Sequence, residues 1–237
     1  MLGRISWEGW AVPPGHEAVR AIAAETPDSE LIRWVDEALR EKSGYTLPPK
    51  IHISQQDGDY YNVMPCIYER GNLAMVKMIG RHGHENRIMD LFRQDPDVHF
   101  VLCDTYEEVI GGSDLVISAI TKVTENFVTD EYFKEGCTVI PICTMGFQNC
   151  DLFFDRVFTD EMEQIRGFKY FDHFAPVTTN VTDVLNGAAP GRTDNVQRIL
   201  VYNYGIAIHD LVFAANIYGR ATVPDTPYRY SREKYFI

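Results

Sequence analysis

Two short, almost uninterrupted apolar segments constrain the fold of this chain more than any other feature. Residues 114–120 read Asp-Leu-Val-Ile-Ser-Ala-Ile, and residues 137–142 read Cys-Thr-Val-Ile-Pro-Ile. Strands that are apolar on both faces are typical of a parallel sheet covered by helices on each side. Segments with helical patterns flank both runs. We therefore expect a doubly wound α/β sheet in this part of the chain.

The alternation of helix and strand extends on both sides of these two runs. The apolar spacing predicts helices over residues 85–94, 106–110, 130–134, 161–166, 181–186 and 207–218, and strands over residues 99–103 and 199–202. The intervening segments are short, as is usual between the elements of an α/β domain. The pattern thus favours a parallel sheet over most of the second half of the chain.

The first 80 residues have a different pattern. Thr26, Pro27 and Asp28 are typical of a helix start, and Gly44 is typical of its end. Three runs rich in β-branched and aromatic residues follow, at residues 51–54, 60–64 and 73–79, with turn residues at 57–58 and 70–72. This order predicts one helix followed by an antiparallel sheet.

The composition excludes several classes of partner. The chain has 237 residues, and 22 Lys and Arg against 34 Asp and Glu give a net charge of −12, which repels nucleic acid and anionic lipid. No apolar segment reaches the length of a membrane span, and residues 1–14 lack the core of a signal peptide. We therefore expect a cytoplasmic protein that binds neither nucleic acid nor membrane.

The five cysteines do not form a recognisable metal or disulfide pattern. Their number is odd, and the spacing of Cys143 and Cys150 matches no standard zinc site. We expect reduced, buried thiols and no metal.

The segment before the last helix carries the most specific motif. Residues 183–192 read Asp-Val-Leu-Asn-Gly-Ala-Ala-Pro-Gly-Arg, and residues 205–211 read Gly-Ile-Ala-Ile-His-Asp-Leu after the predicted strand at 199–202. This order resembles the signature of the ornithine cyclodeaminase/mu-crystallin family. Residues 106–121, and residues 47–52 together with Met64, Pro65 and residues 75–77, are similar to further parts of that family.

The resemblance implies an α/β fold with two domains. One is a Rossmann-like parallel-sheet domain, incomplete here, over residues 83–202. The other is an α+β substrate and dimerisation domain over residues 1–82, joined by residues 203–237. The family also implies a homodimer, NAD as the cofactor with NADP as the alternative, and a small amino or imino acid bound in the cleft between the domains.

The same resemblance implies the site residues. Lys50 and Lys77 match positions whose cations hold the substrate carboxylate; the alternative is that both are solvated lysines. The cofactor is expected to lie along the carboxyl ends of the parallel strands. The residues expected to line it are Cys103, Asp104, Ala119, Ile120, Thr121 and, near the nicotinamide, Tyr204 and Gly205.

Two parts of the family pattern are missing. The sequence has no G-x-G-x-x-G phosphate loop, and Gly80-Arg-His-Gly83 has the wrong spacing. A unit of roughly thirty or more residues, with the loop and an arginine for the substrate carboxylate, is expected to be absent between Ile79 and Asn86. In addition, Met145 stands where cyclodeaminating members carry a proton-exchanging aspartate. The sequence therefore assigns no catalytic residue.

Two functions follow from these observations. One is the NAD-dependent conversion of a small amino or imino acid, by cyclodeamination or by imine reduction. The other is that of a non-catalytic, shortened family member that retains the dimer and ligand-binding surfaces. A third possibility is that the sequence is an incomplete record of a normal family member, which would explain the missing unit.

Overall fold

The computed structural model describes residues 16–54, 60–80, 101, 103–120, 127–142, 147 and 152–221. The chain divides into two compact units. Unit 1 consists of residues 1–46, 66–75 and 208–237, and unit 2 consists of residues 47–65 and 76–207. Each unit therefore combines segments that lie far apart in the sequence.

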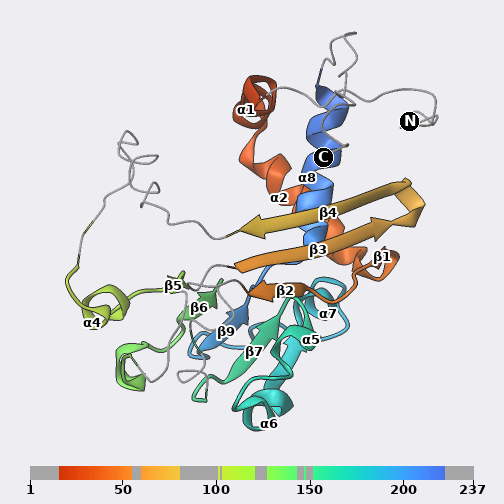
Figure 1. The fold of residues 1–237 in the computed structure, drawn as a ribbon. Coiled ribbons are helices and arrows are strands. Elements are labelled where there is room, and N and C mark those ends of the chain that lie inside the picture. Colours follow the sequence, from red (N-terminus) through yellow and green to blue (C-terminus); the bar gives the residue numbers. More distant parts are fainter. Residues whose placement is uncertain are drawn as a thin grey trace, which may run out of the picture. The chain divides into compact units, whose positions relative to one another are not determined.

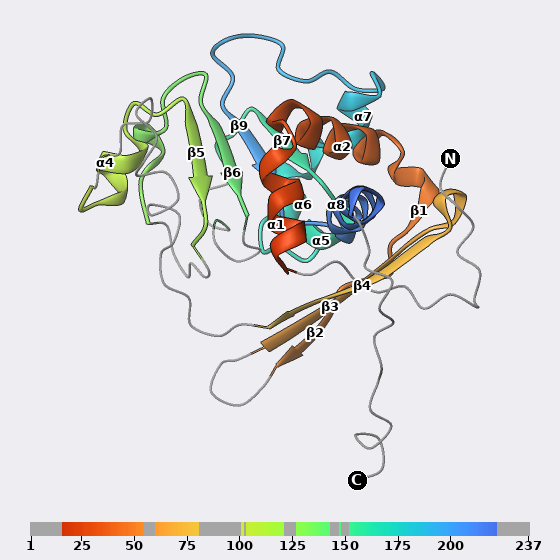
Figure 2. The same ribbon diagram turned by 90° about the horizontal axis from the view of Figure 1, so that it is seen from above.

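The described part of unit 1 contains three α-helices, α1 (His16–Glu25), α2 (Asp28–Arg40) and nearly all of α8 (Ala207–Arg220) (Figures 1 and 2). The start of α2 agrees with the predicted position, because Pro27 occupies the N-cap with a φ of −60°. Thr26 does not cap this helix as predicted. Its hydroxyl donates instead to the carbonyl oxygen of Ile22 at 2.6 Å, which ends α1.

The helices of unit 1 pack around one tryptophan. Trp34 of α2 is 3% exposed, and its ring meets the edge of the Phe213 ring of α8 at a centroid distance of 5.5 Å. The Arg220 guanidinium lies 4.9 Å above the same tryptophan ring. It also contacts the Glu30 carboxylate at 2.5 Å and donates to the Thr26 hydroxyl at 3.1 Å. These contacts join α8 to α2 near the two ends of the described sequence.

The predicted antiparallel strands are present. They are β2 (Ile51–Ser54), β3 (Tyr60–Tyr68) and β4 (Leu73–Gly80), and a short strand, β1 (Tyr45–Thr46), pairs with the end of β3. β3 runs on to Tyr68, beyond the predicted end at Met64. Its first part pairs with β2 in the register Ile51↔Val63. The turn to β4 ends at Asn72, which has a φ of 52°, as the predicted turn at residues 70–72 requires.

Unit 2 contains a five-stranded parallel sheet, which confirms the predicted α/β class. The strand order is β5 (Leu115–Ser118), β6 (Thr138–Pro141), β9 (Ile199–Tyr202), β7 (Arg156–Thr159) and β8 (Thr178–Asn180), as Figure 1 shows. Every pairing between neighbours in this sheet is parallel. The strands β7 and β8 were not predicted from the sequence.

One face of the parallel sheet forms the core of unit 2. Val116, Val139, Val157 and Leu200 line this face and are at most 9% exposed. It is covered by Ile110 of α4 (Tyr106–Ile110), Ile165 of α5 (Met162–Ile165) and Phe174 of α6 (Phe171–Phe174), and by Phe133, Phe147 and Phe154. The clustered phenylalanines give this face the dense packing that a parallel sheet needs.

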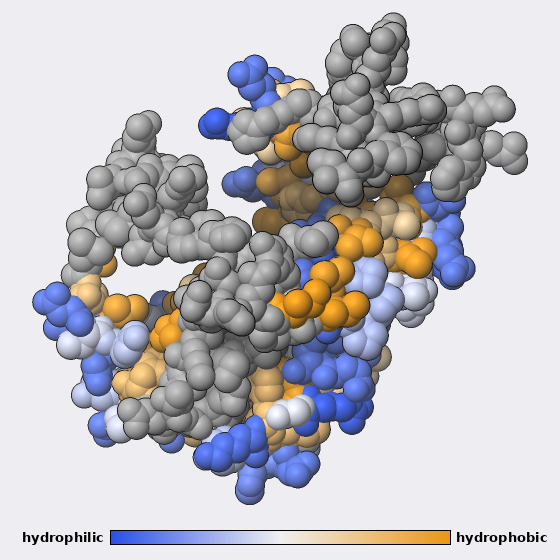
Figure 3. Space-filling view, viewed as in Figure 1, coloured by the Kyte–Doolittle hydropathy of each residue, from blue (hydrophilic) through white to orange (hydrophobic). Residues whose placement is uncertain are grey.

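The opposite face is covered only in part. Near β7 and β9, Phe158 and Ile199 are buried, and α7 (Val181–Leu185) with residues 184–192 lies over them. Arg192 Nη2 donates to the Thr138 hydroxyl at 2.9 Å and holds this segment in place. On β5, in contrast, Leu115 is 54% and Ile117 is 61% exposed. Apolar surface is visible over β5 in Figure 3.

Some predicted elements differ from the structure. The helix predicted over residues 130–134 is a single 3-10 turn, Asp130–Tyr132. Residues 101 and 103 of the strand predicted over 99–103 are not in a strand, and the rest of that segment lies outside the described residues, as does the helix predicted over 85–94. Across the described part of the chain, no helix has both the length and the apolar character of a membrane span.

Candidate functional site

The carboxyl ends of the parallel strands meet at one edge of the sheet. β9, the last strand of the sheet in the sequence, lies between β6 and β7 at the centre of the strand order. Doubly wound sheets bind ligands outside the carboxyl ends of their strands. Asp160 follows β7 directly, and residues 203–206 connect β9 to α8. This edge is therefore the first place to look for a site.

The Gly205 peptide is fixed at this edge by side chains that follow β7. The Asp160 carboxylate, which is 5% exposed, accepts a hydrogen bond from the Gly205 N–H at 2.8 Å. Gln164 Nε2 donates to the Gly205 carbonyl oxygen at 3.4 Å. The φ of Gly205 is +78°, a conformation that favours glycine. A Cβ atom on Gly205 would meet no atom within 4 Å, so the backbone here borders open space.

A pocket of about 520 Å³ lies beside this peptide. Its volume is within the range of small-molecule sites, roughly 300–1,000 Å³. The pocket is lined by Leu47, Pro48, Pro49, Lys50, Met64, Pro65, Glu161, Glu163, Gln164, Ile206 and Ala207. Most of these side chains are apolar, and the polar ones comprise one cation, two carboxylates and one carboxamide. All the lining residues belong to unit 2.

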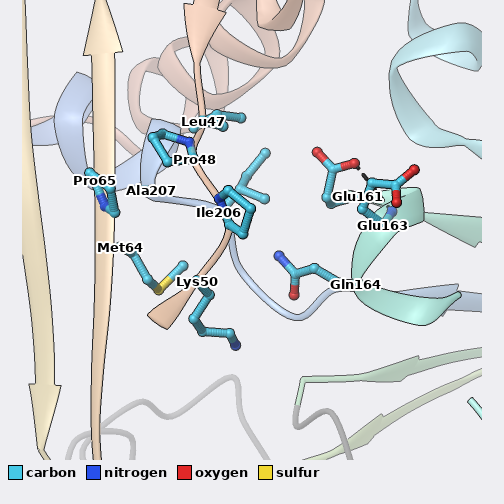
Figure 4. A pocket seen from close by; sticks show the side chains of 11 residues that line it. Leu47, Pro48, Lys50, Met64, Pro65, Glu161, Glu163, Gln164, Ile206 and Ala207 are labelled. Carbon is cyan, nitrogen blue, oxygen red and sulfur yellow. Dashed lines mark hydrogen bonds between the residues drawn. The ribbon is translucent and has the colours of Figure 1, made fainter. Parts of the chain in front are cut away.

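The charged groups lie on opposite sides of the pocket. Figure 4 shows Lys50 at the β2 side, and Glu161, Glu163 and Gln164 at the α5 side. The Glu161 carboxylate accepts from the Glu163 N–H at 3.4 Å and caps α5. The Gln164 side chain is directed towards the space between Lys50 and Ile206. A ligand that carries both an anionic and a cationic group would match this arrangement.

The structure brings only some of the predicted site residues to this pocket. Lys50 lines it, and the Gly205 peptide that follows Tyr204 is bound by Gln164 of its wall. Lys77 lies half-buried on β4 and is not among the lining residues.

The other predicted cofactor residues also lie away from the pocket lining. Ala119 and Ile120 follow β5 at the carboxyl edge, and Cys103 and Asp104 are exposed before α4. Thr121 is outside the described residues.

Two residues of the site were missed by sequence reasoning. Asp160 and Gln164 follow β7, which the sequence analysis did not recognise as a strand. A carboxylate directly after a buried parallel strand is the signal that would have pointed to Asp160. For Gln164 there was no comparable signal, because its position depends on the turn between β7 and α5.

The described cysteines and acidic residues provide no metal site. No group of three or more His, Cys, Asp or Glu side chains suited to a metal occurs among the described residues. Burial, with a smaller contribution from Asp210, raises the pKa of the Cys66 thiol to about 11, and burial also raises the pKa of Cys137. The expectation of buried thiols is confirmed for Cys66 and Cys137 and is wrong for Cys103, which is exposed.

Among the described residues, the site fits only one end of a nicotinamide dinucleotide. Open space beside Gly205 suits a flat ring that approaches the backbone closely. A pyrophosphate needs free N–H groups at a helix start. At α4 the Glu108 N–H donates to the Thr105 hydroxyl and the Asp104 N–H donates to the Glu108 carboxylate. This helix start is acidic and already capped, so it does not fit a phosphate.

The fold and the pocket together define an α/β protein with a pocket of small-molecule size at the carboxyl edge of its parallel sheet. The model of the ornithine cyclodeaminase/mu-crystallin family matches residues 83–224, more than half of the chain. The chain therefore belongs to the ornithine cyclodeaminase/mu-crystallin family.

One curated relative and two solved structures are similar to this chain. The nodulation efficiency protein NfeD of Rhizobium meliloti is 29% identical over 119 residues, which cover 47% of this chain and only 37% of NfeD. A Δ1-pyrroline-2-carboxylate reductase of Thermococcus litoralis, solved with NADH and L-proline, has a TM-score of 0.63 at 12% identity, covering 84% of this chain and 95% of the reductase.

A probable ornithine cyclodeaminase of Bordetella pertussis Tohama I has a TM-score of 0.65 at 9% identity, covering 86% of this chain and 97% of that protein. At these identities the two solved structures establish the fold, which is Rossmann-like.

Proposed function

We propose that the protein binds a small amino or imino acid in the pocket beside Gly205 and converts it with a nicotinamide dinucleotide, by cyclodeamination or by imine reduction. The observation that carries this proposal is the position of the pocket. It combines a lysine, acidic groups and apolar walls at the edge where doubly wound sheets bind ligands.

In this proposal each side of the pocket has a separate role. Lys50 would bind the substrate carboxylate, because an ammonium donates charge-assisted hydrogen bonds to that group. Asp160 and Gln164 would hold the Gly205 backbone, so that a ring can rest against it. A bound nicotinamide would supply hydride transfer. Met64 and Ile206 would exclude water from the reacting carbon.

Other predicted residues keep their roles as proposals. Lys77 would contribute a second cation near the substrate. Tyr204, Cys103, Asp104, Ala119, Ile120 and Thr121 would line the rest of the dinucleotide, with NAD rather than NADP as the first choice. The reductase of Thermococcus litoralis, whose fold the chain shares, is solved with NADH and L-proline and supports this choice of ligands. A homodimer in the cytoplasm is part of the same proposal.

Calorimetry on purified protein tests the proposal. We expect NADH to bind at millimolar concentration, and L-proline to bind in its presence. Lys50→Met should weaken L-proline binding at least about tenfold, because it removes a charged hydrogen bond. Lys169→Met is the control, since Lys169 is exposed outside the pocket and its ammonium faces the Tyr170 ring. The proposal would be contradicted if neither NADH nor NADPH bound, or if Lys50→Met and Lys169→Met weakened L-proline binding equally.

A second candidate is a non-catalytic family member that keeps the ligand pocket. Two observations favour it: the sequence has no G-x-G-x-x-G loop, and α4 offers no free helix start for a phosphate. This candidate predicts amino acid binding without turnover of L-ornithine, L-proline or a cyclic ketimine. Turnover of any of the three, with NAD(H) or NADP(H) added, would eliminate it.

A further inference from the structure

Gln164 occupies a fixed position in the pocket wall. Its backbone N–H donates to the Glu161 carbonyl oxygen at 3.1 Å, and its Nε2 donates to the Gly205 carbonyl oxygen at 3.4 Å. A carbonyl oxygen can only accept hydrogen bonds. The carboxamide must therefore turn its nitrogen to Gly205, and its oxygen is left on the other side.

The carboxamide oxygen of Gln164 is buried, and among the described residues no donor reaches it. A buried acceptor without a donor is unfavourable and uncommon in folded proteins. The same side chain lines the pocket and is directed towards the space between Lys50 and Ile206 (Figure 4). A donor that arrives with a ligand would satisfy this oxygen.

The charges around the pocket indicate which donor this is. Glu161 and Glu163 lie on the same side of the pocket as Gln164, whereas Lys50 lies on the other side. The Glu163 carboxylate is paired with Arg166 at 2.6 Å, so the Glu161 carboxylate supplies the net negative charge on that side. A carboxylate attracts a cationic group, and a lysine attracts an anionic one. The group presented to the Gln164 oxygen is therefore best matched by a protonated nitrogen, with the ligand's carboxylate at Lys50.

We propose that Gln164 is a specificity-determining residue, whose Oε1 accepts a hydrogen bond from the amino or imino N–H of the ligand. The pocket then favours nitrogen-bearing acids over acids of the same shape that have no donor at that position. This inference rests on the proposed function, because the ligand class is taken from it. It adds the residue that recognises the ligand's nitrogen.

Two ligands that differ only at the nitrogen test the inference. L-Proline and cyclopentanecarboxylate share a five-membered ring and a carboxylate, but only proline has the N–H donor. We expect calorimetry, with NADH present, to give at least about tenfold tighter binding of L-proline to the wild-type protein. Gln164→Leu should reduce this preference to about twofold or less, because it removes the acceptor oxygen.

A conservative variant, together with the comparison of the two ligands, separates this role from a structural one. Gln164→Glu keeps an acceptor oxygen and should keep the preference for L-proline. Equal weakening of both ligands by Gln164→Leu, or an unchanged preference, would overturn the inference while leaving the proposed function intact. If the wild-type protein binds neither ligand, the proposed function and this inference both fail.

Discussion

Glycines with positive φ fix turns in unit 2, and two of them form a matched pair. Gly112 and Gly136 both have a φ of +79°. A Cβ atom on Gly112 would meet nothing within 4 Å, whereas a Cβ atom on Gly136 would collide with the backbone oxygen of Asn195. Alanine would therefore have a conformational cost at both positions, but a steric cost only at Gly136.

We expect Gly112→Ala to lower the free energy of unfolding by about 1 kcal/mol, from the left-handed backbone alone. Gly136→Ala should lower it by about 3 kcal/mol, because the Asn195 backbone must also move. Urea denaturation of both variants measures the difference. Equal losses of unfolding free energy in the two variants would mean that the backbone around Asn195 can move without an energetic cost.

Only some residues of the candidate site could be predicted from the sequence. Lys50 was found because it lies in a segment that resembles the family, and the structure places it in the pocket wall. Asp160 and Gln164 were missed, although they hold the Gly205 backbone. Their role depends on the pairing of β7 with β9, which residue spacing alone does not encode.

Among the elements, β5 separates a buried face from an exposed face within one strand. Val116 of β5 is 9% exposed, but its neighbour Ile117 is 61% exposed. In the next strand, Val139 lies on the buried face and is fully buried. A parallel sheet is normally covered on both faces. The exposed side of β5 is thus the least protected part of this sheet.

Alanine substitutions measure this asymmetry. Ile117→Ala should lower the free energy of unfolding by less than about 1 kcal/mol, although it removes more carbon atoms than Val139→Ala. Val139→Ala should cost about 2–3 kcal/mol, because it opens a cavity in the packed face. Both can be compared by urea denaturation. A loss at Ile117 as large as that at Val139 would show that the outer face of β5 is covered in solution.

Element by element, the sequence was most informative where strands are apolar throughout. The runs at β5, β6 and β9 predicted parallel strands, and these are present. β7 begins with Arg156, and β8 reads Thr-Thr-Asn, so neither has the composition of a buried strand. They are strands because neighbours in the sheet complete their hydrogen bonds, and this tertiary effect outweighs local propensity.

At the scale of the whole molecule, the contact of Glu30 with Arg220 joins residues 190 positions apart. The hydrogen bond and charge of Arg220 lower the pKa of Glu30 below its ordinary value of 4.5, and Arg33 adds to this. A lowered pKa in the folded state means that the stabilisation is fully present above the ordinary value. It is lost as the pH falls through the lowered value.

We therefore expect the melting temperature to fall on acidification from about pH 6 to about pH 3, and Glu30→Gln to make this fall smaller by about a degree or two. Arg220→Met should have the same effect, since it removes the main cause of the shift. Melting curves recorded by circular dichroism at several pH values test this. A larger fall of the melting temperature on acidification in either variant would contradict this role of the Glu30–Arg220 contact.

The division of the chain into two units has a consequence for how this protein can be altered. The backbone passes from one unit to the other between Thr46 and Leu47, Pro65 and Cys66, Met75 and Val76, and Ala207 and Ile208. Two of these junctions lie inside strands β3 and β4. No contiguous gene fragment encodes either unit, so recombination with a homologue cannot exchange one as a cassette. The two units must be inherited, expressed and engineered together.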